Sequence, residues 1–183
     1  MKRHLDSCEY KQWEGFYDFY AQVEDRSAHE VWSACTRGDQ MLWLLGCKSG
    51  ETGWPDRKRL VGVGLKVLDA VQAKYGDCAG MLSATRSASE LWLRGADKPG
   101  IRETAIRALD MSFASDKSGD EEEGRILFLA SCVAGIAYAV RPPVLSVRIG
   151  TKAMELFGEY SAPKSIVADI VRSAVPSIPK GGR

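Results

Sequence analysis

The chain has 183 residues, of which 27% are charged and 45% hydrophobic, so it can bury one core without a disulfide scaffold or a structural metal. This composition excludes an intrinsically disordered chain. The formal net charge of +1 at pH 7 gives no overall positive field, so we expect no nucleic acid as a partner. We predict one helical domain over residues 1–175, followed by a flexible C-terminal tail at residues 176–183.

Cysteine usage and hydropathy indicate the compartment. Five cysteines, an odd number, are spread along the chain without a Cys-x-x-Cys pair, which is typical of a reducing cytoplasm. The N-terminus, MKRHLD, runs directly into further charged residues and offers no apolar core of a signal peptide. The longest apolar stretch, residues 126–140, is shorter than the roughly 18 residues that span a membrane. We therefore predict a cytoplasmic protein that does not bind membranes.

The pattern of apolar residues predicts helices throughout the chain. No segment shows the alternation of a half-buried strand. Aromatic residues at helical spacing predict a first helix within residues 13–24. Ser27 is expected to cap a short second helix, because Glu30 stands three residues later, at the capping-box spacing. Asp39 is expected to cap the next helix, which carries the apolar run at residues 41–45.

A long helix is predicted to begin at Pro55 and to end at Gly76. Gly62 and Gly64 lie inside it, and each weakens a helix by about 1 kcal/mol relative to alanine. We interpret both glycines as positions where another helix approaches closely. The elements together predict an all-α fold, a single-domain orthogonal bundle of about eight helices.

The helices in the second half of the chain are predicted from their apolar faces. Residues 115–124 contain no apolar residue, which predicts an exposed loop before the apolar helix at residues 126–140. Pro142 and Pro143 are expected to end that helix, and two shorter helices follow within residues 145–175. The faces expected to be buried are Ala84, Ala88, Leu91 and Trp92 in one helix and Ile101, Ala105, Leu109 and Phe113 in the next.

Residue chemistry offers few candidates for catalysis. The chain has only two histidines, His4 and His29, so a three-histidine zinc site is excluded. Residues 62–64, Gly-Val-Gly, lack the third glycine and the preceding strand of a dinucleotide-binding loop. Cys35 and His29 are six residues apart, which places them on different sides of one helix. We therefore predict no enzyme activity, no catalytic residue, no cofactor and no metal site.

Three segments carry a family resemblance. Residues 32–46, WSACTRGDQMLWLLG, are followed by Asp56, Arg57, Arg59 and Leu60 and then by ELWLRG at residues 90–95. This pattern resembles the Imm5-like family of immunity proteins, which are small all-helical proteins of bacterial toxin systems. The resemblance covers roughly residues 28–95. It implies binding without catalysis, by a rigid helical domain that sequesters a cognate toxin or effector enzyme.

Inhibitors of this type use complementary charge to speed association and buried aromatic anchors to slow release. On that basis the candidate partner-binding residues are Trp54, Asp120, Glu121, Glu122 and Glu123. The acidic run is also what a solvated helix start looks like. Arg37 and Asp39 are interpreted as a pair at a helix start rather than as a site.

The partner of the chain is predicted to be a protein, either a toxin or a nuclease. One alternative reading is a phage or mobile-element accessory protein that inhibits a host defence nuclease, and the sequence does not separate it from the immunity reading. An apolar face left exposed on one of the helices would serve equally well as the surface of a homodimer.

Overall fold

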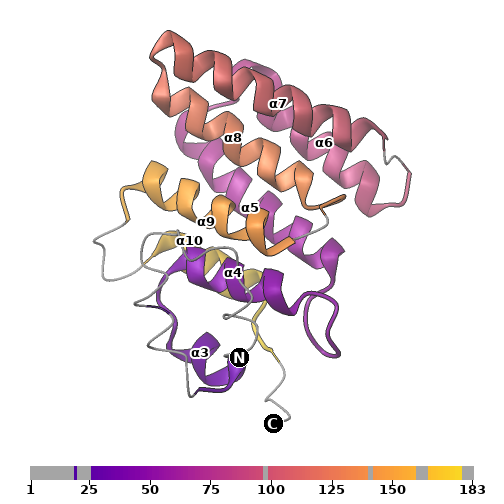
Figure 1. Cartoon of the computed structure of the whole chain (residues 1–183), viewed down its shortest axis with the longest axis vertical. Helices are drawn as coiled ribbons and strands as arrows, with labels where there is room; N and C mark the ends of the chain where they lie inside the picture. The colour runs from indigo at the N-terminus through magenta and orange to yellow at the C-terminus, as the bar shows by residue number, and fades with distance from the viewer. Residues whose placement is uncertain (1–18, 20–25, 97–98, 140–141, 160–164, 179–183) are drawn as a thin grey trace.

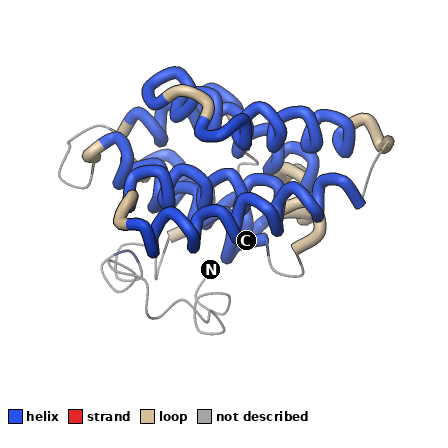
Figure 2. Tube along the Cα trace, turned by 90° about the horizontal axis from the view of Figure 1, so that it is seen from above, coloured by secondary structure: helices blue, strands red, loops and turns tan. Residues whose placement is uncertain are grey.

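The computed structural model of the chain describes residue 19 and residues 26–96, 99–139, 142–159 and 165–178. These residues form helices and connecting turns without a strand, which confirms the predicted all-α multi-helix bundle (Figure 2). The predicted first helix, at residues 13–24, lies outside the described residues except for Phe19. The elements are α3 (Ala28–Ala34), α4 (Gly38–Lys48), α5 (Arg57–Tyr75), the 3-10 turn η1 (Cys78–Gly80), α6 (Met81–Leu93), α7 (Pro99–Ser118), α8 (Glu121–Gly135), α9 (Pro142–Phe157) and α10 (Ile166–Ala174).

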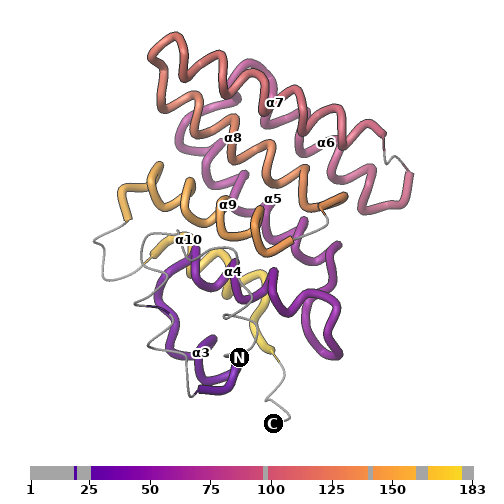
Figure 3. The backbone as a smooth tube through the Cα atoms, in the orientation of Figure 1, coloured from indigo at the N-terminus to yellow at the C-terminus, as the bar shows by residue number. Residues whose placement is uncertain are grey.

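Four helices follow one another across one side of the molecule. α7 packs on α8, α8 packs on α9, and α9 packs on α4 (Figure 1). α5 runs behind α8 and α9, while α6 lies against α7 and α8 (Figure 3). α7 is therefore at the outer edge of this row, and its far side has no neighbouring helix in the view of Figure 1.

The glycines of α5 differ in what surrounds them. A Cβ atom added at Gly64 would lie 3.2 and 3.3 Å from the two methyl carbons of Val133 in α8, so the prediction of a close helix approach is confirmed there. A Cβ atom added at Gly62 would have no neighbour within 4 Å, so the same prediction is wrong for Gly62. Gly62 lies on a side of α5 where no other helix reaches the backbone.

The helix starts agree in part with their sequence signals. The Ser27 hydroxyl accepts from the Glu30 N–H at 3.2 Å, and the Glu30 carboxylate accepts from the Ser27 N–H at 2.7 Å, which confirms the capping box. α5 begins two residues later than predicted, because Asp56 caps it by accepting from the N–H of Arg59 at 2.8 Å. Asp39 is not the N-cap of α4, since it lies inside the first turn, but its carboxylate accepts from the free N–H of Gln40 at 2.8 Å, as expected of a residue at a helix start.

The predicted buried faces of α6 and α7 are correct in part, since Ile101 and Ala105 are buried and Ala88 and Trp92 are partly buried on the core. Leu91 and Phe113 were expected in the core but are exposed, Phe113 by 53%. Small residues allow these helices to approach one another closely, so small side chains fill the interface and larger ones lie outside it. The buried residues are Met81, Leu82, Thr85 and Ser89 in α6 and Ile101, Ala105, Ala108, Ser112 and Ser115 in α7.

The predicted loop at residues 115–124 is almost entirely helical. α7 continues to Ser118 and α8 begins at Glu121, so only Gly119 and Asp120 separate the two helices. Most of the segment is exposed, as its polarity predicts. The prediction of irregular structure fails because serine, aspartate and lysine are tolerated in a solvated helix whose other face is already packed.

The described C-terminal residues pack on the bundle. Glu159 is buried, and its carboxylate accepts from the hydroxyl of Ser165 and from the N–H of Ile166, both at 2.7 Å. This contact fixes the start of α10. Ile178, which falls in the predicted tail at residues 176–183, is buried against the core, while residues 179–183 lie outside the described part of the chain.

None of the described helices combines the length and the apolar character that crossing a bilayer requires.

Candidate functional site

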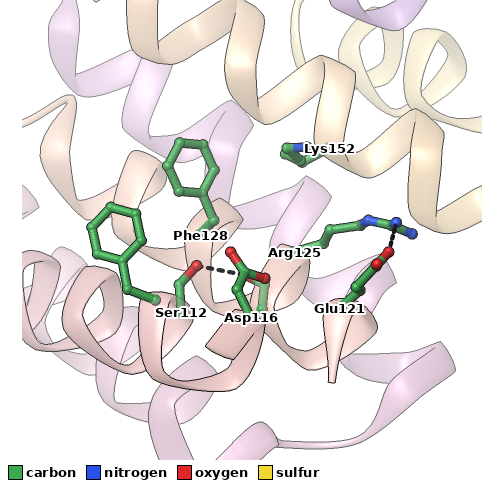
Figure 4. A pocket seen from close by; sticks show the side chains of 8 residues that line it. Ser112, Asp116, Glu121, Arg125, Phe128 and Lys152 are labelled. Atoms are coloured by element: carbon green, nitrogen blue, oxygen red, sulfur yellow. Dashed lines mark hydrogen bonds and ion pairs between the residues drawn. The ribbon is translucent and has the colours of Figure 1, made fainter. Parts of the chain in front are cut away.

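An open hollow of about 440 Å³ lies where the C-terminal half of α7, the N-terminal half of α8 and α9 meet (Figure 4). We call it the charged hollow. Four of its side chains are ionisable and two are phenylalanines, so it joins apolar walls to fixed charges. The residues that line it are Ser112, Phe113 and Asp116 of α7, Glu121, Gly124, Arg125 and Phe128 of α8, and Lys152 of α9.

The floor of the charged hollow is formed by a close approach of α7 to α8. A Cβ atom added at Gly124 would collide with the carboxylate of Asp116 and would lie 3.4 Å from the carbonyl oxygen of Ser112. The Ser112 hydroxyl donates to the carbonyl oxygen of Gly124 at 2.8 Å. Gly124 is therefore the residue that allows the carboxylate of Asp116 to lie over α8.

The wall formed by α8 and α9 is a chain of alternating charges. Arg125 contacts Glu121 at 2.7 Å and Glu155 at 3.9 Å, and Lys152 contacts Glu155 at 2.7 Å. The guanidinium of Arg148 lies 5.7 Å from the ring centroid of Phe128, within the range of a cation–π contact. Exposed ion pairs of this kind add little to stability, but they hold the charged groups at defined positions around the ring of Phe128.

The four predicted acidic residues have different environments. Asp120 caps α8 by accepting from the N–H of Glu123 at 3.0 Å, and the carboxylate of Glu123 accepts from the hydroxyl of Ser115 at 2.8 Å. Glu121 is paired with Arg125 and lines the charged hollow. Glu122 is exposed and has no ion pair or side-chain hydrogen bond within the described residues.

Trp54, the fifth predicted residue, lies elsewhere. It belongs to the connection between α4 and α5, where it is half-buried against the core and its backbone N–H donates to the carbonyl of Glu51 at 3.0 Å. This connection and the turn between α7 and α8 lie at opposite ends of the molecule in Figure 1. The structure therefore does not bring Trp54 together with the acidic residues.

Arg37 and Asp39 form a bidentate ion pair at the start of α4. Nε of Arg37 lies 3.1 Å from one carboxylate oxygen of Asp39, and Nη2 lies 2.8 Å from the other. The side chain of Asp39 is fully buried and that of Arg37 is 30% exposed. One oxygen of Asp39 also accepts from the N–H of Gln40 at 2.8 Å. Asp39 is thus enclosed by protein groups and is not open to a ligand.

A second hollow, of about 520 Å³, lies at the N-terminal end of α7. Pro99, Arg102, Glu103 and Ile106 of α7 line it together with Tyr138, which follows α8. Burial raises the pKa of the Tyr138 hydroxyl, and the positive charge of Arg102 opposes this shift. The sequence does not indicate either hollow, because each is completed by a side chain far along the chain from α7, Lys152 in the first and Tyr138 in the second. Each hollow does contain one exposed apolar residue of α7, Ile106 in the second and Phe113 in the first.

Two of the thiols are held in their protonated form. Burial raises the pKa of Cys35 to about 11 and that of Cys132 to about 12. A thiol reacts as a nucleophile through its thiolate, so neither group is activated at neutral pH. Among the described residues, no three His, Cys, Asp or Glu side chains are placed to hold a metal ion.

No family model matches this chain, and no curated protein or solved structure is significantly similar to it. The resemblance to immunity proteins and the predicted partner therefore stay predictions, and the charged hollow carries the argument for function.

Proposed function

We propose that this chain is a non-catalytic protein-binding domain, an immunity-type inhibitor that sequesters a cognate toxin or effector enzyme. The observation that carries the proposal is the charged hollow, in which Phe113 and Phe128 lie among Asp116, Arg125 and Lys152. Protein interfaces typically join a few aromatic anchors in the centre to a polar and charged rim. Phe113 is 53% exposed, and burial of this ring by a partner would be favourable.

The charges around the hollow are suited to recognition. Arg125 is shared between Glu121 and Glu155, so a partner carboxylate can replace the exposed carboxylate of Glu121 at low cost. Glu122 and the neighbouring carboxylates at the start of α8 add a negative field next to the hollow. This field would accelerate association with a basic partner surface.

The experiment is capture of the partner by the tagged full chain from its native host, followed by mass spectrometry. We expect one stoichiometric enzyme, whose purified activity the chain abolishes at a one-to-one ratio. The variant Lys152→Glu reverses a charge in the hollow and should lose most of the capture. The matched control Lys66→Glu makes the same change at an exposed position of α5 that lines neither hollow.

Two outcomes would contradict the proposal. One is that no enzyme is captured at stoichiometric amounts. The other is that Lys152→Glu and Lys66→Glu capture the same enzyme equally well, which would place the contact elsewhere. The identity of the enzyme also distinguishes the two readings of the sequence, because a host defence nuclease would favour the accessory protein over the immunity protein.

A further inference from the structure

α7 carries an unusual set of charged side chains. All six are exposed, and none has an ion pair or a side-chain hydrogen bond to another described residue. Three are positive and three are negative, so the helix has no net charge, but these charges do not pair with one another. The six residues are Arg102, Glu103, Arg107, Asp110, Asp116 and Lys117. On α8 and α9, by contrast, Arg125 and Lys152 are paired with carboxylates.

The exposed side of α7 also carries an apolar stripe. Ile106 is 47% exposed and Phe113 is 53% exposed, and Leu109 lies between them at intermediate exposure. Helical spacing places Arg102 and Asp116 at the two ends of the same stripe, each seven residues from Leu109. The stripe therefore reads, from one end to the other, positive, apolar, apolar, apolar, negative.

This order is self-complementary when two copies of α7 lie antiparallel. A two-fold axis at Leu109 brings Ile106 of one copy beside Phe113 of the other. The same axis brings Arg102 of each copy opposite Asp116 of its mate, about 10 Å from the axis at 1.5 Å per residue. Each unpaired charge at the ends of the stripe then gains a partner of opposite sign, twice in the dimer.

We propose that this exposed stripe of α7, whose ends border the two hollows, is a dimerisation surface whose occupant is α7 of a second copy of this chain. The adjoining row of charges fits the same arrangement. Glu103, Asp110 and Lys117 are spaced by seven residues, so in the antiparallel pair Glu103 lies near Lys117 of the second copy. Asp110 lies close to its own symmetry mate, which is the one unfavourable contact of the arrangement.

The inference concerns self-association and does not require the proposed function, although Phe113 and Asp116 belong to both surfaces. Residues of α7 at other angles serve as controls. Arg107 is exposed and unpaired like Arg102, but it is rotated about 100° around the helix from Ile106. A charge reversal at Arg107 therefore changes the net charge equally without touching the stripe.

The experiment is sedimentation equilibrium of the full chain and of two charge-reversed variants, Arg102→Asp and Asp116→Arg. We expect the unchanged chain and Arg107→Asp to dimerise. Arg102→Asp and Asp116→Arg each place like charges opposite one another, and each should weaken the dimer at least about tenfold. An equimolar mixture of Arg102→Asp with Asp116→Arg should form a heterodimer, because both cross-copy pairs are then of opposite sign.

Recovery of association in this mixture is the decisive result, because misfolding does not produce it. The mixture of Arg107→Asp with Asp116→Arg has the same net charges but leaves Arg102 opposite the introduced arginine, so it should recover less association. Circular dichroism of each variant verifies that it is folded. The proposal is overturned if the unchanged chain sediments as a monomer at all concentrations tested. It is also overturned if the mixture of Arg102→Asp with Asp116→Arg stays as weakly associated as its two components. Asp110→Asn should tighten the dimer, because it removes the like charges at the axis.

Discussion

Gly150 of α9 lies directly against the backbone of Asp39 in α4. A Cβ atom added at position 150 would collide with Cα of Asp39 and would lie 2.9 Å from its backbone nitrogen. Backbone atoms cannot move aside as a flexible side chain can, so Gly150→Ala must separate the two helices. We expect a loss of about 1–3 kcal/mol in the free energy of unfolding, measured by urea unfolding followed by circular dichroism.

Gly62→Ala is the matched change with the opposite expectation. Position 62 lies inside α5 and is open, so alanine should fit there without strain. The gain is expected to be about 0.5–1 kcal/mol, because alanine has the higher helix propensity and restricts the unfolded chain. A higher urea midpoint for Gly150→Ala would contradict the close packing of α4 on α9, and a lower one for Gly62→Ala would contradict the open placement of Gly62.

Arg37→Ala removes one partner of a largely buried ion pair and leaves the carboxylate of Asp39 without its guanidinium. An unpaired buried charge is costly, so we expect destabilisation of about 3 kcal/mol. Arg94→Ala provides the comparison, because Arg94 is 74% exposed and lies 3.6 Å from Glu90. That change should cost less than about 0.5 kcal/mol in the same urea experiment. Equal losses would contradict the buried placement of Asp39.

Thr85→Val tests an unsatisfied group in the core. The hydroxyl of Thr85 is buried on α6 and has no hydrogen-bond partner. Valine has nearly the same shape and does not bury an unpaired polar atom, so the variant should be more stable by about 1 kcal/mol. A rise in the thermal midpoint is the expected readout. A fall would indicate that the hydroxyl is bonded in solution, for example to a trapped water.

The buried thiols should be protected from alkylation. With a pKa of about 11 for Cys35 and about 12 for Cys132, almost no thiolate is present at pH 8. We expect iodoacetamide to label Cys78, which is only partly buried, well before either of them in the folded chain. In urea all three should react at similar rates, and peptide mass spectrometry gives the order. Early labelling of Cys132 would contradict its burial in α8.

The same two thiols predict a loss of stability at alkaline pH. Both pKa values are raised from 9.0 by burial, so the unfolded chain releases these protons at a lower pH than the folded chain does. Their contribution is fully present below about pH 9 and is lost as the pH rises through 11 to 12. Cys132→Ala should therefore flatten the alkaline fall in the free energy of unfolding relative to the unchanged chain.

Local sequence signals predicted the helices well. The capping box of Ser27 and Glu30 needs only residues three apart. The start of α8 at Glu121 was predicted less well, because the polar run at residues 115–124 is also typical of a loop. The exact buried faces of α6 and α7 could not be predicted in the same way. Which face of these helices is buried depends on the fit of small residues such as Ala108 between helices, and that fit is set by tertiary packing.

The candidate site was predicted only in part. Glu121 belongs to the charged hollow, but Lys152 and Phe128 join it from positions up to 31 residues away along the chain. No periodicity within one helix indicates such a meeting. Trp54 was predicted as an exposed aromatic anchor, yet its side chain, in the connection between α4 and α5, packs partly on the core.

Phe113 and Asp116 belong both to the charged hollow and to the outer stripe of α7. A copy bound along α7 would cover one wall of the hollow. A chain in the dimer could then not bind a partner enzyme in the hollow at the same time. Mass action then makes the apparent affinity for the enzyme fall as the chain becomes more concentrated. A dimer of this kind would act as a reservoir, from which dilution or binding of the proposed partner releases single chains.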